Sequence, residues 1–125
     1  MHRSASAPSK ALFFLALVVC GIAQAADATR GKELYESRCG GCHSLDQDRI
    51  GPRHRGLIGR KAGAVAGFEY SPALRASRIV WSSQTLDAWL TNPERLIPGQ
   101  RMNYSVPDAA DRAALIAYLE AQSRP

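Results

Sequence analysis

Sulfur-containing and metal-binding side chains are scarce in this chain, which has three cysteines, two methionines and three histidines among 125 residues. Two of the cysteines lie together in the pentapeptide Cys39-Gly40-Gly41-Cys42-His43. A structural zinc site is usually built from four ligands, often two pairs. Outside the pentapeptide the chain offers only His2, Cys20 and His54, so zinc is the weaker interpretation of this stretch.

Other absences exclude further classes of protein. No alternation of apolar and polar residues precedes Cys39, so the βαβ setting that a thioredoxin-type dithiol needs is missing. The chain has no Walker-type loop, internal repeat or low-complexity run. Its net charge of +5 is too small to predict nucleic acid as a partner.

The first 25 residues have the three parts of a secretory signal peptide. Arg3 and Lys10 form a basic start, Ala11–Ile22 is an apolar run, and Ala23-Gln24-Ala25 fits the cleavage pattern. We expect cleavage after Ala25, which leaves residues 26–125 as one small domain exported to a bacterial periplasm. If the segment is not cut, it would anchor the protein to a membrane.

Cleavage would change the composition of the chain. It would remove Cys20, so that both remaining cysteines belong to the pentapeptide. A lipoprotein modified at Cys20 is disfavoured because bulky Val19 precedes it. Residues 26–125 keep 14 of the 16 basic and all 11 acidic residues, which leaves a net charge of +3. This charge suits docking to acidic protein surfaces.

The pentapeptide is the attachment signature of a c-type haem. Two thiols at this spacing can form thioethers with the two vinyl groups on one porphyrin edge. The neighbouring His43 then lies where its neutral imidazole can bind the iron. We therefore predict one covalently attached haem c, held by Cys39 and Cys42, with His43 as an axial ligand.

Met102 is the best candidate for the second axial ligand. It is the only methionine after the predicted signal peptide, and it lies in a turn rich in proline and glycine, not on an apolar helix face. A thioether opposite an imidazole raises the reduction potential of haem iron. The competing ligands are His54, Lys32, Lys61 and the terminal amine. Two filled axial positions would keep substrates off the iron, so we expect no enzymatic activity.

The rest of the chain predicts an all-α fold with long loops. Asp27 or Thr29 can cap a first helix that runs into Cys39. The other expected helices run from Ser71-Pro72 to about Ser77, from Ser82 or Ser83 to Asn92, through a short turn after Pro93 to Leu96, and from Pro107-Asp108 onwards. No convincing strand pattern is present. Glycines punctuate the stretch between residues 51 and 67, which could wrap closely around a flat ligand.

Ordered motifs along the mature chain resemble those of class I c-type cytochromes, of the mitochondrial and short bacterial soluble types. They are Gly31-x-x-x-Tyr35-x-x-x-Cys39, Gly51-Pro52, Gly56-Leu57-x-Gly59-Arg60-Lys61-x-Gly63, Gly67-Phe68-Glu69-Tyr70-Ser71, Trp81-x-x-x-Thr85-Leu86, Leu90-x-Asn92-Pro93-x-x-x-Ile97-Pro98-Gly99-x-x-Met102 and Leu115–Leu119. The resemblance implies a class I cytochrome c fold, with about three main helices and some short ones around the haem.

The resemblance also implies roles for individual residues. The carbonyl of Pro52 should accept a hydrogen bond from His43, and Gly31 should lie against Tyr118 where the first and last helices cross. Three further residues are expected around the haem propionates, with Tyr70 and Trp81 as hydrogen-bond donors and Arg60 as a nearby positive charge. Gln100 and His54 depart from the family's pattern, and the sequence gives them no role.

The function implied is that of a monomeric one-electron carrier in a respiratory chain, with protein donors and acceptors and no small-molecule substrate. Five basic residues lie beside the motifs that surround the haem edge and are expected to dock acidic partners: Arg38, Arg49, Lys61, Arg95 and Arg101. Two alternatives remain open. The chain could be a haem subunit bound tightly to a catalytic oxidoreductase, or a gas-sensing or peroxidatic haem protein with a labile sixth ligand.

Overall fold

A computed structural model describes the backbone of residues 11–125 and the side chains of residues 22–25 and 27–125. The basic start of the predicted signal peptide, with Arg3 and Lys10, lies outside the described residues. The elements in chain order are α1 (Ala11–Leu34), η1 (Tyr35–Cys39), α2 (Pro72–Ala76), α3 (Ser83–Thr91), α4 (Pro93–Leu96) and α5 (Ala109–Ala121).

The predicted all-α class is confirmed for this part of the chain. Residues 11–125 contain no β-strand, and the one β-type pairing among them is an isolated bridge between Lys61 and Val80. None of the helices that the structure describes is long and apolar enough to cross a membrane.

The predicted start of the first helix at Asp27 or Thr29 is wrong for the full chain, because α1 begins at Ala11 and passes through both residues. Thr29 Oγ1 donates a hydrogen bond to the Ala25 carbonyl 3.0 Å away, the pattern of a threonine inside a helix, not of a cap. Alanine has the highest helix propensity, and no proline interrupts residues 23–28, so nothing in the sequence stops the helix there.

The other helix starts agree with the sequence, because a polar side chain caps each of them. Ser71 accepts a bond from the amide of Leu74, and Ser82 forms a reciprocal capping box with Thr85. Asn92 caps α4 and Asp108 caps α5 in the same way. Each cap satisfies an amide that the first helical turn leaves without a partner.

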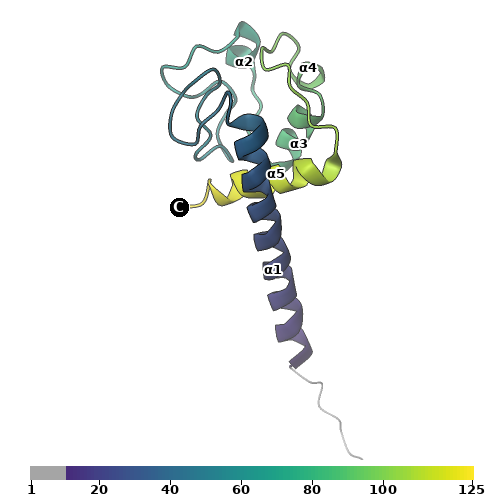
Figure 1. Cartoon of the computed structure of the whole chain (residues 1–125). Helices are drawn as coiled ribbons and strands as arrows, with labels where there is room; N and C mark the ends of the chain where they lie inside the picture. Colours follow the sequence, from purple (N-terminus) through teal and green to yellow (C-terminus); the bar gives the residue numbers. More distant parts are fainter. Residues whose placement is uncertain (1–10) are drawn as a thin grey trace, which may run out of the picture.

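The central contact of the fold is the crossing of α1 and α5 (Figure 1). Gly31 makes it possible, because a Cβ atom there would lie 1.9 Å from the Ala114 carbonyl oxygen and 2.9 Å from Tyr118 Cβ. The expected contact between Gly31 and Tyr118 is confirmed. Buried Asp111 of α5 pairs with both Arg30 and Arg38, so charge also joins the two helices.

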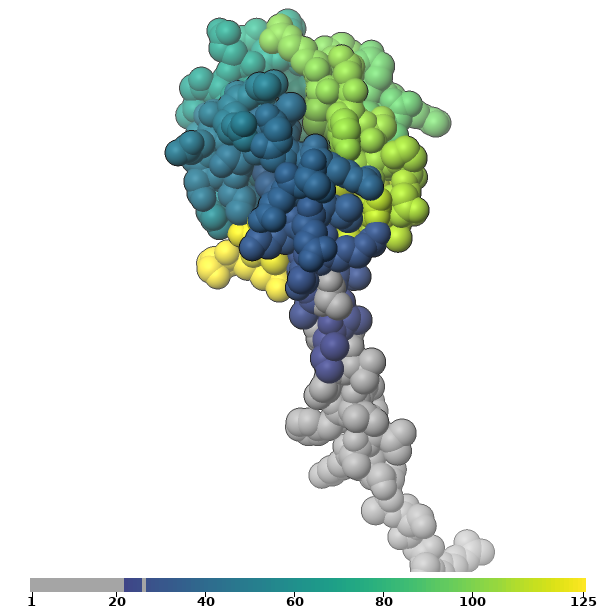
Figure 2. Space-filling view, viewed as in Figure 1, coloured from purple at the N-terminus to yellow at the C-terminus, as the bar shows by residue number. Residues whose placement is uncertain are grey.

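The remaining segments form one rounded body (Figure 2), and the first part of α1 extends away from it (Figure 1). The glycine-rich stretch after Pro52 has no regular structure, and Gly56, Gly59, Gly63 and Gly67 all have positive φ angles. Leu57, Ala62 and Val65 of the same stretch are buried in the core. The long loop is therefore part of the packed domain.

Candidate functional site

The pentapeptide Cys39–His43 begins at the last residue of the π-helical turn η1, which continues the first helix. The amides of Cys42 and His43 both donate to the Cys39 carbonyl, at 3.0 and 2.8 Å, which winds the pentapeptide into a tight turn. Cys39 is partly buried and packs against the core, whereas Cys42 is exposed. Burial raises the pKa of the Cys39 thiol to about 11, so the thiol is protonated at neutral pH.

His43 is oriented by the backbone of the following loop. Its Nδ1 donates a hydrogen bond to the Pro52 carbonyl oxygen 2.9 Å away, the contact that the resemblance implied. A carbonyl can only accept, so Nδ1 carries the hydrogen and Nε2 keeps its lone pair for a metal. Burial lowers the pKa of His43, which also favours the neutral ring that binds metals.

Gly51 fits against the edge of the same ring. A Cβ atom at Gly51 would lie 2.1 Å from His43 Cε1 and 2.5 Å from Nδ1, so no larger residue fits without moving the imidazole. The amide of Gly51 donates to the Cys42 carbonyl at 2.9 Å. The loop therefore holds the pentapeptide by a backbone bond and by shape.

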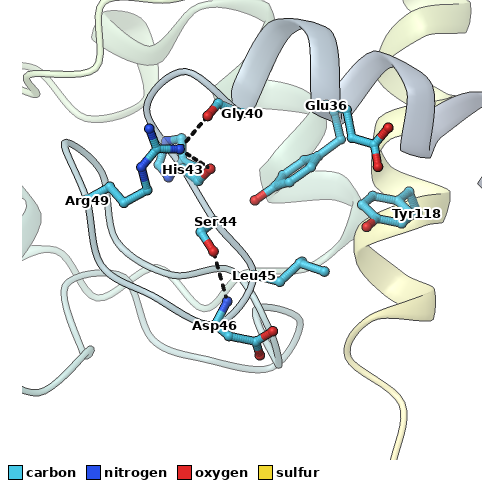
Figure 3. A pocket seen from close by; sticks show the side chains of 9 residues that line it. Glu36, Gly40, His43, Ser44, Leu45, Asp46, Arg49 and Tyr118 are labelled. Atoms are coloured by element: carbon cyan, nitrogen blue, oxygen red, sulfur yellow. Dashed lines mark hydrogen bonds between the residues drawn. The ribbon is translucent and has the colours of Figure 1, made fainter.

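Arg49 holds the pentapeptide from the other side. Its guanidinium donates to the carbonyls of Gly40, Gly41 and His43, two of which are drawn in Figure 3. Arg49, Gly40 and His43 line part of an open hollow of about 410 Å³. Its other walls include Tyr35, Tyr118 and the loop at Ser44–Asp46. The hollow lies directly beside His43.

His54, which the sequence offered only as a competing iron ligand, lies in this site. Its ring stacks on that of His43, with centroids 3.9 Å apart, and its Nδ1 is hydrogen-bonded to the Tyr35 hydroxyl at 3.0 Å. Burial, followed by the charges of His43 and Arg60, holds its pKa well below the ordinary value. Because it lies beside His43, it is poorly placed to serve as the opposite ligand. The Gly51-Pro52 turn, which brings residue 54 back to His43, is the sequence signal for this contact.

Met102 lies in the loop after α4. Its side chain is partly buried and packs against the hydrophobic core, so the thioether faces an apolar environment. The loop begins with buried Ile97 and turns at Gly99, whose φ angle is +90°. The expectation that Met102 is not on a helix face is confirmed.

Of the three residues expected around the propionates, Arg60 and Tyr70 lie in the long loop before α2, and Trp81 lies between α2 and α3. The amide of Trp81 donates to the Arg60 carbonyl at 2.9 Å, and the Arg60 guanidinium donates to the Arg53 carbonyl at 2.7 Å. The Tyr70 hydroxyl accepts a bond from the Val65 amide at 3.1 Å, which leaves its own hydrogen free to be donated. Burial raises the pKa of Tyr70, so the phenol keeps that hydrogen.

The five basic residues expected to dock partners are all exposed. Two of them are also engaged within the protein, since Arg38 pairs with Asp111 at 2.9 Å and Arg49 binds the carbonyls named above. Lys61, Arg95 and Arg101 lie on loops or on the short α4. Sequence position alone did not distinguish these two groups.

The donor set fits a covalently attached haem. It offers two thiols on one turn, an imidazole whose outer nitrogen is already bonded, and a thioether against apolar residues. The profile of a protein family described as Cytochrome c matches residues 28–123. This chain belongs to the cytochrome c family. Members of the family carry one covalently attached haem c with iron, and this chain is a monohaem electron carrier.

Individual relatives agree with this assignment. The chain is 41% identical over 102 residues to cytochrome c 2.1 of Caenorhabditis elegans, covering 79% of this chain and 92% of the relative. It is 39% identical over 100 residues to cytochrome c-type cyt cy of Rhodobacter capsulatus, and the match covers 78% of this chain and 50% of that relative. The solved structure of cytochrome cH from Methylobacterium extorquens superposes with a TM-score of 0.72 at 31% identity. The match covers 75% of this chain and 97% of that structure. The class I fold implied by the sequence motifs is therefore confirmed.

Proposed function

We propose that this cytochrome is an exported one-electron carrier whose iron is held between His43 and Met102, with thioethers at Cys39 and Cys42. The observation that carries the proposal is the bond from His43 Nδ1 to the Pro52 carbonyl. It fixes the tautomer and orientation of the imidazole and makes Nε2 a better donor to a metal. When bound, the haem supplies an iron that accepts and releases one electron.

The residues around this centre have distinct tasks. Met102 would supply a thioether as the second ligand of the iron, which would favour the reduced state and keep substrates away. For this reason the protein performs no bond-making chemistry. Tyr70 and Trp81 donate hydrogen bonds to a propionate, and Arg60 supplies positive charge beside it. The Tyr70 hydroxyl supports this role, because it accepts from the Val65 amide and still has its own hydrogen to donate.

Export to a bacterial periplasm completes the proposal. The profile match begins at residue 28, just after the predicted cleavage point at Ala25. Cleavage would leave residues 26–125 as the functional domain. The carrier would take its electron from one protein and pass it to another, docking through exposed basic residues, and would act as a monomer.

The decisive experiment is an optical spectrum of the secreted protein, oxidised and reduced, together with its mass. A mass increased by one haem, a sharp reduced α-band and the weak sulfur-to-iron charge-transfer band of the oxidised protein are expected. Replacing Met102 by alanine should abolish the charge-transfer band and lower the midpoint potential. A bare polypeptide, or a Met102→Ala variant with an unchanged band, would overturn the proposal. Rapid binding of carbon monoxide to the reduced native protein would instead support the labile-ligand alternative.

A further inference from the structure

The loop that carries Met102 has an unusual backbone at both ends. Gly99 has a φ angle of +90°, and Asn103 has a φ angle of +48°. Asn103 is the one non-glycine residue with positive φ among residues 11–125, a conformation that costs energy for most side chains. Such a turn needs further interactions to stay closed.

Gln100 supplies those interactions from inside the loop. It is 5% exposed, and its side-chain amide makes three hydrogen bonds. Nε2 donates to Glu94 Oε2 at 3.0 Å and to Asn103 Oδ1 at 2.6 Å, while Oε1 accepts from the Asn103 amide at 2.9 Å. A buried amide with a missing partner is costly, so these bonds favour one loop geometry. Two of them bridge directly across Arg101 and Met102.

Glu94 connects this bridge to helix α4. Its second oxygen, Oε1, accepts a hydrogen bond from the Gly99 amide at 3.0 Å. The two bonds from Gln100 and Gly99 lower the pKa of the Glu94 carboxyl, so the charged form, the stronger acceptor, is present at neutral pH. The Glu94 carboxylate therefore binds both the backbone of Gly99 and the side chain of Gln100.

We propose that Gln100, bonded to Glu94 and Asn103, is a positioning residue that keeps the Met102 loop closed over the metal. We call these three residues the Gln100 clasp. The clasp opposes the loss of the thioether, because Met102 can move away only if hydrogen bonds on both sides of it break. This inference rests on the proposed role of Met102 as an axial ligand.

The test measures how fast an external ligand replaces the thioether in the oxidised holoprotein. Imidazole is added at neutral pH, and the limiting rate at saturating imidazole reports the opening of the loop. We expect Gln100→Ala and Glu94→Ala to raise this rate about tenfold, since each removes two or three hydrogen bonds. Asn103→Gly keeps the positive φ angle and removes only the side chain, and should raise the rate about threefold.

Two control variants separate the clasp from general destabilisation. Arg101 lies inside the loop and its side chain is exposed, so the Arg101→Ala variant should exchange the thioether for imidazole at the parental rate. Ile116→Val removes one methyl group from the core of α5, so it should lower unfolding stability by chemical denaturant without changing the exchange rate. If the Gln100 variant fails to fold, the exposed Glu94 and Asn103 variants still decide the matter.

The outcomes distinguish the two proposals. A parental protein without the sulfur-to-iron band refutes Met102 as the ligand. If the parental protein has the band but all clasp variants exchange the ligand at the parental rate, the clasp is refuted and Met102 remains the ligand. Equal acceleration by Arg101→Ala and Gln100→Ala would also refute it, since any change in the loop would then have the same effect.

Discussion

The segment around His43 and the loop around Met102 differ in what holds them. The segment around His43 is held mainly by backbone groups, since its partners are the Pro52 carbonyl, the missing side chain of Gly51 and carbonyls bound by Arg49. The loop around Met102 is held by the side-chain hydrogen bonds of the Gln100 clasp. Both proposed ligands are positioned within one domain by different kinds of contact.

This difference has a physical consequence. Backbone carbonyls are present whatever the side chain, so we expect the His43 segment to tolerate many substitutions but not an added Cβ at Gly51. Side-chain bonds depend on residue identity, so the Met102 loop can be loosened by single substitutions without unfolding the protein. We expect the two segments to respond differently to the changes below.

The largest effect should come from the helix crossing that both segments depend on. In Gly31→Ala, the new Cβ would overlap the Ala114 carbonyl, which the helices can relieve only by separating. Unfolding of the oxidised holoprotein by denaturant should show a loss of about 3 kcal/mol. Both proposed ligands should be lost in the same transition. A variant as stable as the parent would show that α1 and α5 do not cross at this point.

Gly51→Ala should damage the His43 segment alone. Its Cβ would overlap the imidazole, and we expect a loss of about 2 kcal/mol in unfolding stability together with a changed low-spin magnetic resonance spectrum. Gly41→Ala is the matched control, since a Cβ there meets nothing within 4 Å. Equal effects of the two variants would contradict the tight fit of Gly51 against His43.

Arg49→Gln should have a smaller effect on the same segment. It removes hydrogen bonds to three carbonyls of the pentapeptide and should cost about 1 kcal/mol in denaturant unfolding. Arg53→Gln is the comparison, because its side chain makes a surface ion pair with Asp48 and such pairs contribute little. If Arg53→Gln costs as much, the carbonyl contacts of Arg49 are not what holds the segment.

Acid should loosen the Met102 loop before the His43 segment. The pKa of Glu94 in the folded protein lies below its ordinary value of 4.5, so its stabilising effect is present above that pH and is lost as the pH falls through the folded value. The sulfur-to-iron band, followed from about pH 6 to about pH 3, should therefore weaken. In Glu94→Gln this part of the pH dependence should be absent. An identical titration in both proteins would exclude Glu94 as its source.

The smallest expected effects concern docking. Arg101→Ala and Arg95→Ala remove exposed charges near Met102 and should each slow electron transfer to an acidic redox protein about twofold at low salt. Arg38→Ala should change this rate less, because the Arg38 guanidinium is paired with Asp111, which offsets part of its charge. Rates measured by flash photolysis over a range of salt concentrations would check the order. A rate that does not depend on salt would argue against electrostatic docking.

Much of the fold could be predicted from the sequence, because the signals are local. Ser71, Ser82, Asn92 and Asp108 mark helix starts through hydrogen bonds made within three residues. The start of α1 was predicted wrongly because Asp27 and Thr29 resemble caps only if the helix is not already formed before them. The resemblance to a family supplied the contact of Gly31 with Tyr118 and that of His43 with Pro52.

In the candidate site, too, some features could be predicted from the sequence and others could not. The sequence by itself determined the cofactor chemistry, because the spacing of Cys39, Cys42 and His43 along the chain suits one porphyrin edge and the methionine after residue 25 is unique. Only the tertiary structure decided that His54 stacks on His43, that Asp111 pairs with Arg38, and that Gln100 binds Glu94 and Asn103. Most of these contacts join residues whose side chains carry no motif, and their geometry depends on where packing leaves each loop.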